Sequence, residues 1–345
     1  MTSGETLIDG PYFEDLRLGQ RFDDSPSLTL TDGLAAAHQA IVGCRLPLAL
    51  DRDLAARVIG KEDPAADGGG RAALAAPNLV WDVAIGQSTS ATHTVRANLF
   101  YRGVVFRRAP RIGDALRTVT EVVGLRQNSR RPGRPATGLV ALRISSRDQQ
   151  DRPVLDFWRC AMLPLRDGEL ETGQADDLSA VGTEPEPGDL AQVAAGWDLD
   201  AYRDLAPGRP GDPAPGQVFR VAGGDVVSSA PELARLTLNV ARIHHDATAG
   251  SAGRLVYGGH TIGIALHQAV RALPAIVTVV GWHGCDHTGP VREGDTLTST
   301  VEVERVEPAA TGGRLAHLRS LVQAHRPGEP PADVLDWRFV ALLAQ

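Results

Sequence analysis

The 345-residue chain has few cysteines, and their positions exclude two kinds of stabilising cross-link. Only Cys44, Cys160 and Cys285 are present, an odd number of residues that lie far apart. Disulfide-stapled domains usually carry an even set of cysteines, and structural zinc sites usually carry paired Cys-x-x-Cys motifs. Neither a disulfide framework nor a cysteine-rich metal site is therefore predicted, and a reducing compartment is expected.

The sequence also lacks a long apolar run and a concentrated basic surface. No stretch approaches the roughly 18–20 apolar residues of a membrane-spanning helix, and the first residues contain no basic region followed by an apolar core. The formal net charge is -7, and the one basic run, at 126–134, is interleaved with turn residues as in a hairpin loop. We therefore expect a cytoplasmic protein that binds neither membrane nor nucleic acid.

Several catalytic motifs are absent as well. The chain has no P-loop, no nucleotide-binding glycine fingerprint and no Gly-x-Ser-x-Gly elbow. Phosphoryl transfer, hydride transfer and serine hydrolysis are therefore disfavoured. The residues that are present, 43% hydrophobic and 22% charged, are typical of a globular protein, and the length allows two domains.

Self-comparison shows an internal duplication. Three motifs recur in the same order: a Gly-Gln-x-Phe opener, a Gly-Asp turn before an alternating strand, and a Val-Leu-Asp segment that ends in Trp-Arg. The pairs lie at 19–22 and 216–219, at 112–122 and 293–303, and at 154–159 and 334–338. Two units are therefore predicted, at residues 10–165 and 197–345, joined by an exposed and mobile linker at 166–196.

One buried helix is predicted in each unit. Residues 259–273, entered through Gly258, are apolar nearly all round, and residues 78–88 follow Pro77 in a similar way. A helix that is apolar on every side must be buried. We therefore predict an α+β fold in which each unit curls a mostly antiparallel sheet around one central helix. Four tryptophans are expected to pack these layers: Trp81, Trp158, Trp282 and Trp337.

Six segments, spread over nearly the whole chain, carry a family resemblance. They lie at Tyr12–Gln20, Ala97–Tyr101, Glu121–Ser129, Asn239–Asp246, Leu255–His260 and Gly294–Leu297. In these segments the chain resembles the MaoC-like acyl-CoA dehydratases in their double hot-dog form, and most of all the mesaconyl-CoA hydratase (β-methylmalyl-CoA dehydratase) branch. The block that contains Tyr257 is the most specific of them.

The resemblance implies a catalytic centre in the second unit. The wider family places an Asp and a His five residues apart before the central helix, and a glycine amide at the start of that helix. These positions fall on Asn239, His244 and Gly258. Because an amide cannot act as a base, His244 would carry the proton transfer, and Asn239, which the mesaconyl-CoA branch also has, would align water or a hydroxyl. The Gly258 amide would stabilise an enolate oxygen.

The first unit is predicted to lack catalytic residues, because Val42 and Pro47 stand opposite Asn239 and His244. It would supply half of the thioester cleft, with Asn98, Tyr101 or the loop at Arg126 as contacts. The predicted substrate contacts of the second unit are Tyr257, Gly259, His260, His287 and Arg242.

Some of these contacts have alternative roles. Tyr257 and His260 flank the oxyanion glycines, and packing is an equal alternative for both. His287 would pair with a free carboxylate of a diacid substrate. Together with His283 and Cys285 it would also share one face of a strand, but no fourth ligand has suitable spacing, so no metal site is predicted.

The sequence therefore predicts a hydro-lyase that reversibly adds or removes water across the C2=C3 bond of a short acyl-CoA. The acyl group would be branched or dicarboxylic, of the mesaconyl-CoA or β-methylmalyl-CoA type, with no cofactor. A homodimer is expected because hot-dog sheets commonly pair. Two alternatives stay open. One is a dehydratase of carrier-protein-linked intermediates in polyketide or fatty-acid biosynthesis. The other is a non-catalytic acyl-CoA-binding protein, which is supported by Asn239 in place of the Asp of the wider family.

Overall fold

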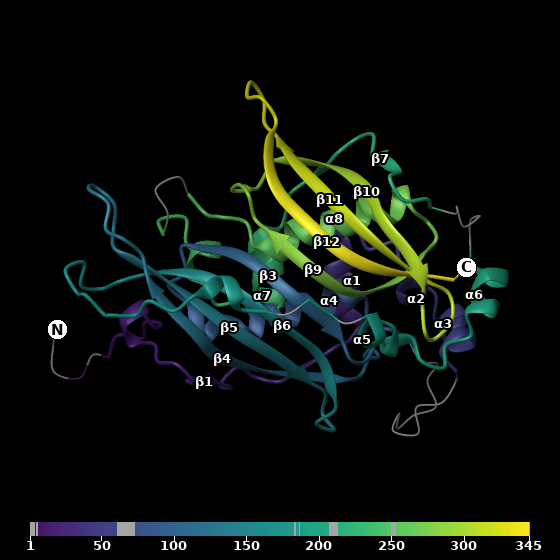
Figure 1. Ribbon diagram of the computed structural model, residues 1–345, viewed down its shortest axis with the longest axis horizontal. Helices are drawn as coiled ribbons and strands as arrows, with labels where there is room; N and C mark the ends of the chain where they lie inside the picture. The colour runs from purple at the N-terminus through teal and green to yellow at the C-terminus, as the bar shows by residue number, and fades with distance from the viewer. Residues whose placement is uncertain are drawn as a thin grey trace.

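The computed structural model of the chain describes residues 4, 6–60, 73–182, 184, 185, 187–206, 213–249 and 253–344. Within these ranges the strands form one sheet with the order β1-β4-β5-β6-β3-β9-β12-β11-β10-β7. The short strands β2 and β8 pair with β4 and β10. The strands of the first unit therefore occupy one half of the sheet and those of the second unit the other half (Figure 1).

The elements of the two units follow one another in a similar order. The strands are β1 (Arg21–Phe22), β2 (Leu28–Thr29), β3 (Ala97–Phe106), β4 (Ala115–Gln127), β5 (Thr137–Arg147), β6 (Pro153–Pro164), β7 (Val218–Arg220), β8 (Asp225–Val226), β9 (Ile276–Asp286), β10 (Thr296–Pro308), β11 (Arg314–His325) and β12 (Ala332–Leu343). The α-helices are α1 (Asp32–Val42), α2 (Pro47–Leu50), α3 (Arg52–Val58), α4 (Pro77–Gln87), α5 (Pro187–Ala191), α6 (Leu199–Leu205), α7 (Ala230–Leu236) and α8 (Gly258–Ala272). The 3-10 helices are η1 (Phe13–Asp15), η2 (Ser88–Thr92), η3 (Leu178–Ala180), η4 (Gln192–Ala194) and η5 (Arg242–His244).

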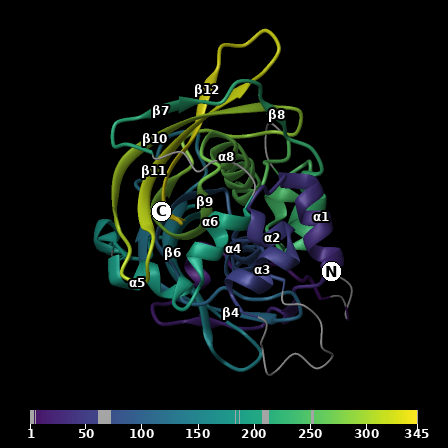
Figure 2. The ribbon, with the colours of Figure 1, turned by 90° about the vertical axis from the view of Figure 1, so that its right-hand side faces the viewer.

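The two central helices lie where the sequence predicts them. Every residue of α4 is buried, and most of α8 is buried as well. Strands β9 to β12 curve around α8, which Figure 2 shows nearly end-on. No helix in the described part of the chain is long and apolar enough to cross a membrane. The α+β double hot-dog architecture is therefore confirmed.

The two units share one hydrophobic core. Strand β3 pairs antiparallel with β9, so the two half-sheets are continuous, and α4 packs against α8. Trp81 of α4 meets Trp282 of β9 edge-on, with ring centroids 4.8 Å apart, and both contact Trp337 of β12. Such edge-to-face contacts are favourable, and they require both units at once.

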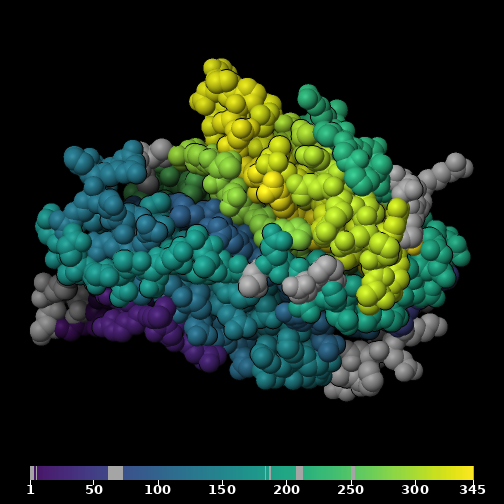
Figure 3. Space-filling model, viewed as in Figure 1, coloured from purple at the N-terminus to yellow at the C-terminus, as the bar shows by residue number. Residues whose placement is uncertain are grey.

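The segment that joins the units is exposed over much of its length, and a few buried apolar residues anchor it. Leu178 is 6% exposed and Leu190 is fully buried. Arg102 of β3 donates hydrogen bonds from Nη1 to the carbonyl oxygens of Ser179 and Val181, at 3.1 and 3.2 Å. The teal segment therefore runs over the sheet (Figures 1 and 3). The Gly, Pro, Asp and Glu residues account for the exposed stretches, whereas the buried apolar anchors are not apparent from the composition.

Candidate active site

A cavity of about 390 Å³ opens between the two units. The first unit contributes residues of α4, η2, β3 and β6, and the second contributes residues of the segments 239–244 and 253–261 and of the loop after β9. The described lining residues include Arg96, Arg159 and Arg292, together with His244 and His287, but no Asp or Glu. The excess of positive charge suits an anionic ligand.

The segment that carries the predicted catalytic residues is held by the first unit. The backbone N–H of Val240 donates to Oγ1 of Thr89 at 2.9 Å, and that of Arg242 donates to the carbonyl oxygen of His93 at 2.9 Å. A Cβ atom on Gly86 of α4 would lie 1.8 Å from the carbonyl oxygen of Thr237, so a glycine is required there. The first unit therefore positions the site as well as lining it.

His244 lies at the end of η5 and lines the cavity. Its Nδ1 lies 2.9 Å from the carbonyl oxygen of Leu255. Because a carbonyl only accepts, Nδ1 carries the proton and Nε2 keeps a lone pair. Burial lowers the pKa of His244 to about 4, so the ring is neutral at physiological pH. Among the described residues Nε2 has no hydrogen-bond partner, which leaves it free to accept a proton from a ligand.

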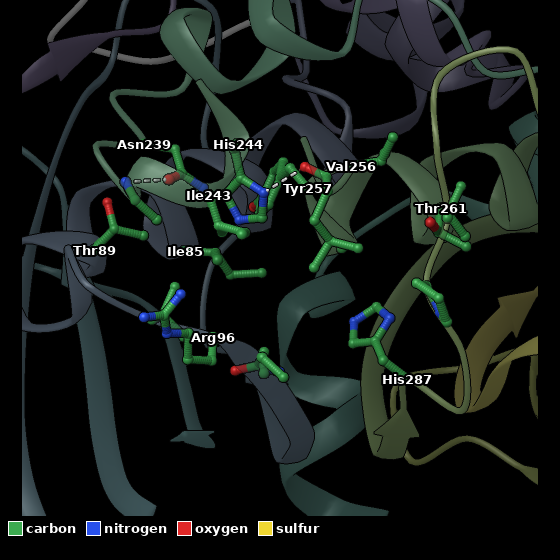
Figure 4. Close-up of a pocket in the computed structure, with 18 of the residues that line it drawn as sticks. Ile85, Thr89, Arg96, Asn239, Ile243, His244, Val256, Tyr257, Thr261 and His287 are labelled. Carbon is green, nitrogen blue, oxygen red and sulfur yellow. Dashed lines mark hydrogen bonds between the residues drawn. The ribbon is translucent and has the colours of Figure 1, made fainter. Parts of the chain in front are cut away.

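Asn239 is oriented by its own turn. Oδ1 of Asn239 accepts the backbone N–H of Ala241 at 2.9 Å, as the dashed line in Figure 4 shows. The Nδ2 amide group is buried and has no partner among the described residues. Because Asn239 lines the cavity, this orphaned group is available to donate to a ligand atom. The preceding residue, Leu238, has a positive φ of 60°, which sharpens the turn.

Gly258 is the first residue of α8, and no side chain caps the helix. Its amide is therefore one of the unsatisfied N–H groups at a helix N-terminus, where negative charge is favoured. A Cβ atom at position 258 would lie 2.5 Å from Nε2 of His287, so any larger residue would displace that ring.

His287 and His244 lie on opposite sides of the cavity (Figure 4). Its Nε2 is buried and has no partner among the described residues. Burial, reinforced by the neighbouring His244, lowers the pKa of His287 to about 4. Without a ligand His287 is therefore a neutral hydrogen-bonding group near pH 7, and its ion pair with a substrate carboxylate stays a prediction.

Tyr257 lines the cavity with its ring, whereas its hydroxyl is engaged elsewhere. The hydroxyl lies 3.2 Å from Oδ1 of Asp82, and the ring meets His244 edge-on at 5.7 Å. The pKa of Tyr257 is raised well above 10, first by burial and then by Asp82, so the phenol stays protonated. Asp82 is also 2.8 Å from Nε2 of His38, a buried pair from the first unit that the sequence reasoning missed. The Tyr257 ring therefore packs against the His244 ring, while the Tyr257 hydroxyl contacts Asp82 of the first unit.

Three predicted substrate contacts do not line the cavity. Gly259 faces the first unit, where a Cβ atom would lie 2.0 Å from Oδ1 of Asp82. His260 is fully buried, and Arg242 is exposed and lies 3.8 Å from Asp246. For Gly259 and His260 the reason is the helical geometry of α8, which turns successive side chains to different faces. Both residues therefore pack in the interior and do not line this cavity.

The three residues that would imitate a zinc site are also separated. His283 stacks on His317 of β11, whereas His287 follows the end of β9 at Asp286 and faces the cavity. Strand alternation therefore does not extend to His287, and the predicted common face with His283 and Cys285 is wrong. Within the described ranges no three His, Cys, Asp or Glu side chains are grouped so as to hold a metal ion.

His260 should make the protein less stable in acid. Burial lowers its pKa to about 4 from 6.5, so the unfolded chain binds a proton between these values that the folded protein rejects. Stability must then fall as pH decreases through this window, by up to about 3 kcal/mol from this residue. Urea unfolding gives the free energy of unfolding at about pH 7.5 and at about pH 5. We expect His260→Leu to reduce the difference between these two free energies. An unchanged difference would show that the folded protein accepts this proton.

Arg159 of β6 is a lining residue that the sequence reasoning missed. The repeat motif aligns Trp158-Arg159 with Trp337-Arg338, but Trp337 is fully buried and Arg338 exposed, whereas Arg159 is 3% exposed. Counted from the shared Val-Leu-Asp, the first unit has one extra residue before its Trp-Arg pair. A shift of one residue moves every side chain of a strand to the other face. Counting from Val154 would have placed Arg159 inward.

Comparisons with known proteins agree with this fold. No protein-family model matches the chain. It is 30% identical over 331 residues to mesaconyl-CoA hydratase from Cereibacter sphaeroides, across 92% of this chain and 90% of that protein. It is 27% identical to beta-methylmalyl-CoA dehydratase from Chloroflexus aurantiacus, across 97% of each.

Two solved structures extend the likeness. A conserved hypothetical protein from Mycobacterium tuberculosis with a double hot-dog fold matches 96% of this chain and 98% of its own, with a TM-score of 0.87 and 53% identity. A putative MaoC domain protein dehydratase from Chloroflexus aurantiacus matches 99% of both chains, with a TM-score of 0.82 and 25% identity.

Proposed function

Since the chain belongs to the family of MaoC-like double hot-dog dehydratases, we propose that it is a hydro-lyase acting on a thioester of coenzyme A. One observation carries the proposal beyond the family likeness. The His244 lone pair, the orphaned Asn239 amide and the uncapped N-terminus of α8 at Gly258 line the same cavity. These are a base, a hydrogen-bond donor and an oxyanion site.

The residues divide the hydration step as follows. Nε2 of His244 takes a proton from water while the water oxygen bonds to C3 of the enoyl thioester. The C2=C3 electron pair moves toward the carbonyl, and the N–H of Gly258 stabilises the enolate oxygen. His244 then returns the proton to C2, so one water molecule is added overall, and dehydration is the reverse.

Two further groups assist this step. Asn239 donates from Nδ2 to the water or hydroxyl oxygen and so fixes its position. His287 lies beside Gly258, with its unpartnered Nε2 placed to serve as a second donor to the carbonyl oxygen. No described lining residue is a carboxylate, so this site lacks the Asp of the wider family and differs from a thioesterase that needs a carboxylate to activate water.

We further propose a short, branched or dicarboxylic acyl group of the mesaconyl-CoA or β-methylmalyl-CoA type. The named relatives act on such thioesters, and their similarity spans nearly the whole of this chain. The cavity volume of about 390 Å³ suits a small acyl group with part of its pantetheine arm.

The proposal is tested with a panel of enoyl thioesters. Mesaconyl-CoA, crotonyl-CoA, a long-chain enoyl-CoA and the mesaconyl group on a carrier protein are each incubated with the protein, and loss of the conjugated absorbance is followed. We expect hydration of the short CoA thioesters, with faster turnover of mesaconyl-CoA than of the same acyl group on a carrier protein. Binding without any turnover across the panel would contradict the hydro-lyase and favour a non-catalytic acyl-CoA-binding protein.

A further inference from the structure

Arg159 places a buried guanidinium at the wall of the cavity. Its Nη2 donates to the carbonyl oxygen of Ser88 at 3.0 Å and to Oγ1 of Thr92 at 2.7 Å. Its Nε is buried and has no partner among the described residues. At least one donor of the planar fork is therefore unused inside the protein.

Among the described residues, no carboxylate balances the charge of Arg159. In the described part of the chain, no Asp or Glu oxygen lies within ion-pair distance of the guanidinium. The buried Asp82 is already paired with His38 and accepts from Tyr257. Arginine keeps its proton in proteins, and a buried charge without a partner is costly. Its retention at a cavity wall indicates a ligand that supplies the opposite charge.

The duplication provides an internal comparison. Counting from Val154 and Val334, which open the shared Val-Leu-Asp motif, the position of Arg159 corresponds to Phe339. Phe339 is fully buried and stacks on Trp337, with centroids 3.9 Å apart. The second unit therefore fills this inward position with an apolar side chain. The hot-dog fold itself does not require a cation here, so packing does not explain Arg159.

We propose that Arg159 binds the free carboxylate of a dicarboxylic acyl-CoA, so that the first unit selects the acyl group while the second unit carries out the chemistry. This inference rests on the proposed function, because it assigns the acyl end of the same thioester to this wall. Arginine suits the task, since its fork matches the two carboxylate oxygens. His287 is neutral near pH 7 and offers no competing charge.

A binding experiment tests the assignment without any turnover. Succinyl-CoA and butyryl-CoA share the CoA moiety and a saturated four-carbon acyl chain, and they differ in a carboxylate against a methyl group. We expect the wild-type protein to bind succinyl-CoA more tightly by about 10- to 100-fold, the range for a buried charge-assisted hydrogen bond. Arg159→Gln should abolish this preference and leave the affinity for butyryl-CoA unchanged, and Arg159→Lys should retain part of the preference.

The matched control is Arg338→Gln, the partner of Arg159 in the repeat motif. Arg338 is exposed and bonds Glu304 at 3.0 Å, so its loss should leave both affinities unchanged. Equal wild-type affinity for the two thioesters would overturn the proposal, even if Arg159→Gln failed to fold. An equal loss for succinyl-CoA, butyryl-CoA and free CoA in the folded variant would also overturn it, because Arg159 would then recognise the CoA phosphates or the thioester.

Turnover separates this inference from the proposed function. Mesaconyl-CoA and 2-methylbut-2-enoyl-CoA differ by the same carboxylate-to-methyl change. Arg159→Gln should lower kcat/KM for mesaconyl-CoA by about 10- to 100-fold and spare the methyl analogue. The wild-type protein could hydrate neither thioester while it still preferred succinyl-CoA, and Arg159→Gln could remove that preference. The proposed hydro-lyase activity would then be wrong and the carboxylate site would stand. If wild type and variant both hydrated the two thioesters with equal kcat/KM, the carboxylate site would be contradicted and the hydro-lyase proposal would stand.

Discussion

Replacing His244 by alanine is expected to lower the turnover number for enoyl-CoA hydration by about 10²–10⁴-fold, the usual contribution of a positioned general base. In the proposed mechanism the Nε2 lone pair of His244 accepts the proton of water, and no carboxylate among the described lining residues can take over that role. Among the described residues the ring makes one polar contact, to the carbonyl oxygen of Leu255. Folding should therefore survive, and circular dichroism would check it.

The control for His244 is His325→Ala on β11, whose side chain bonds Oγ1 of Thr298 and does not line the cavity. The control variant should keep wild-type turnover. In the wild-type enzyme, kcat/KM should stay level from neutral pH to about pH 5 and fall below the His244 pKa of about 4, because protonation removes the lone pair. Full hydratase activity in His244→Ala would remove this residue from the mechanism.

Replacing Asn239 by alanine should be nearly as damaging. We expect a loss of about 10²–10³-fold in turnover, comparable with the removal of one preorganised donor in an oxyanion hole. The buried Nδ2 of Asn239 has no protein partner among the described residues, so its hydrogen bonds are available to a ligand. Affinity for a saturated acyl-CoA should change far less than turnover, because the positioned water takes part only in the reaction. Unimpaired turnover in Asn239→Ala would contradict this assignment.

Asn239→Asp is the informative companion to the alanine variant. One carboxylate oxygen would still accept the N–H of Ala241, as Oδ1 does now, and the other would face the cavity as an acceptor. Such a group restores the acid/base pair of the wider family, so the variant should retain more turnover than Asn239→Ala. Equal losses in both variants, measured with the same enoyl-CoA, would show that donation from Nδ2 is indispensable.

Much of the candidate site was predictable because it lies close together in the sequence. Asn239 and His244 lie in one short segment that ends with η5, and Gly258 begins the next helix, α8. All three residues line the cavity. The resemblance supplied their roles, which the structure leaves as proposals. For His260 the sequence leaves packing and substrate contact as equal alternatives, and α8 turns its side chain into the core, which favours packing.

Other members of the site were hidden for two physical reasons. His38 and Asp82 belong to elements of the first unit, and only the packing of α4 against the second unit brings Asp82 to Tyr257. Arg159 was concealed by a strand register, because the Trp-Arg motif aligned well while one extra residue reversed the faces. Local patterns report neither non-local contacts nor small shifts in register.

The duplication and the two buried helices, α4 and α8, follow from the sequence alone, because apolar periodicity and repeated motifs are local properties of the chain. The folded chain alone shows that the segment 237–244 of the second unit rests on the first unit through Gly86 and Thr89. It also shows that Arg159 faces the cavity without a counter-charge among the described residues. These features depend on contacts between residues 67 or more positions apart, which strand pairing and helix packing create.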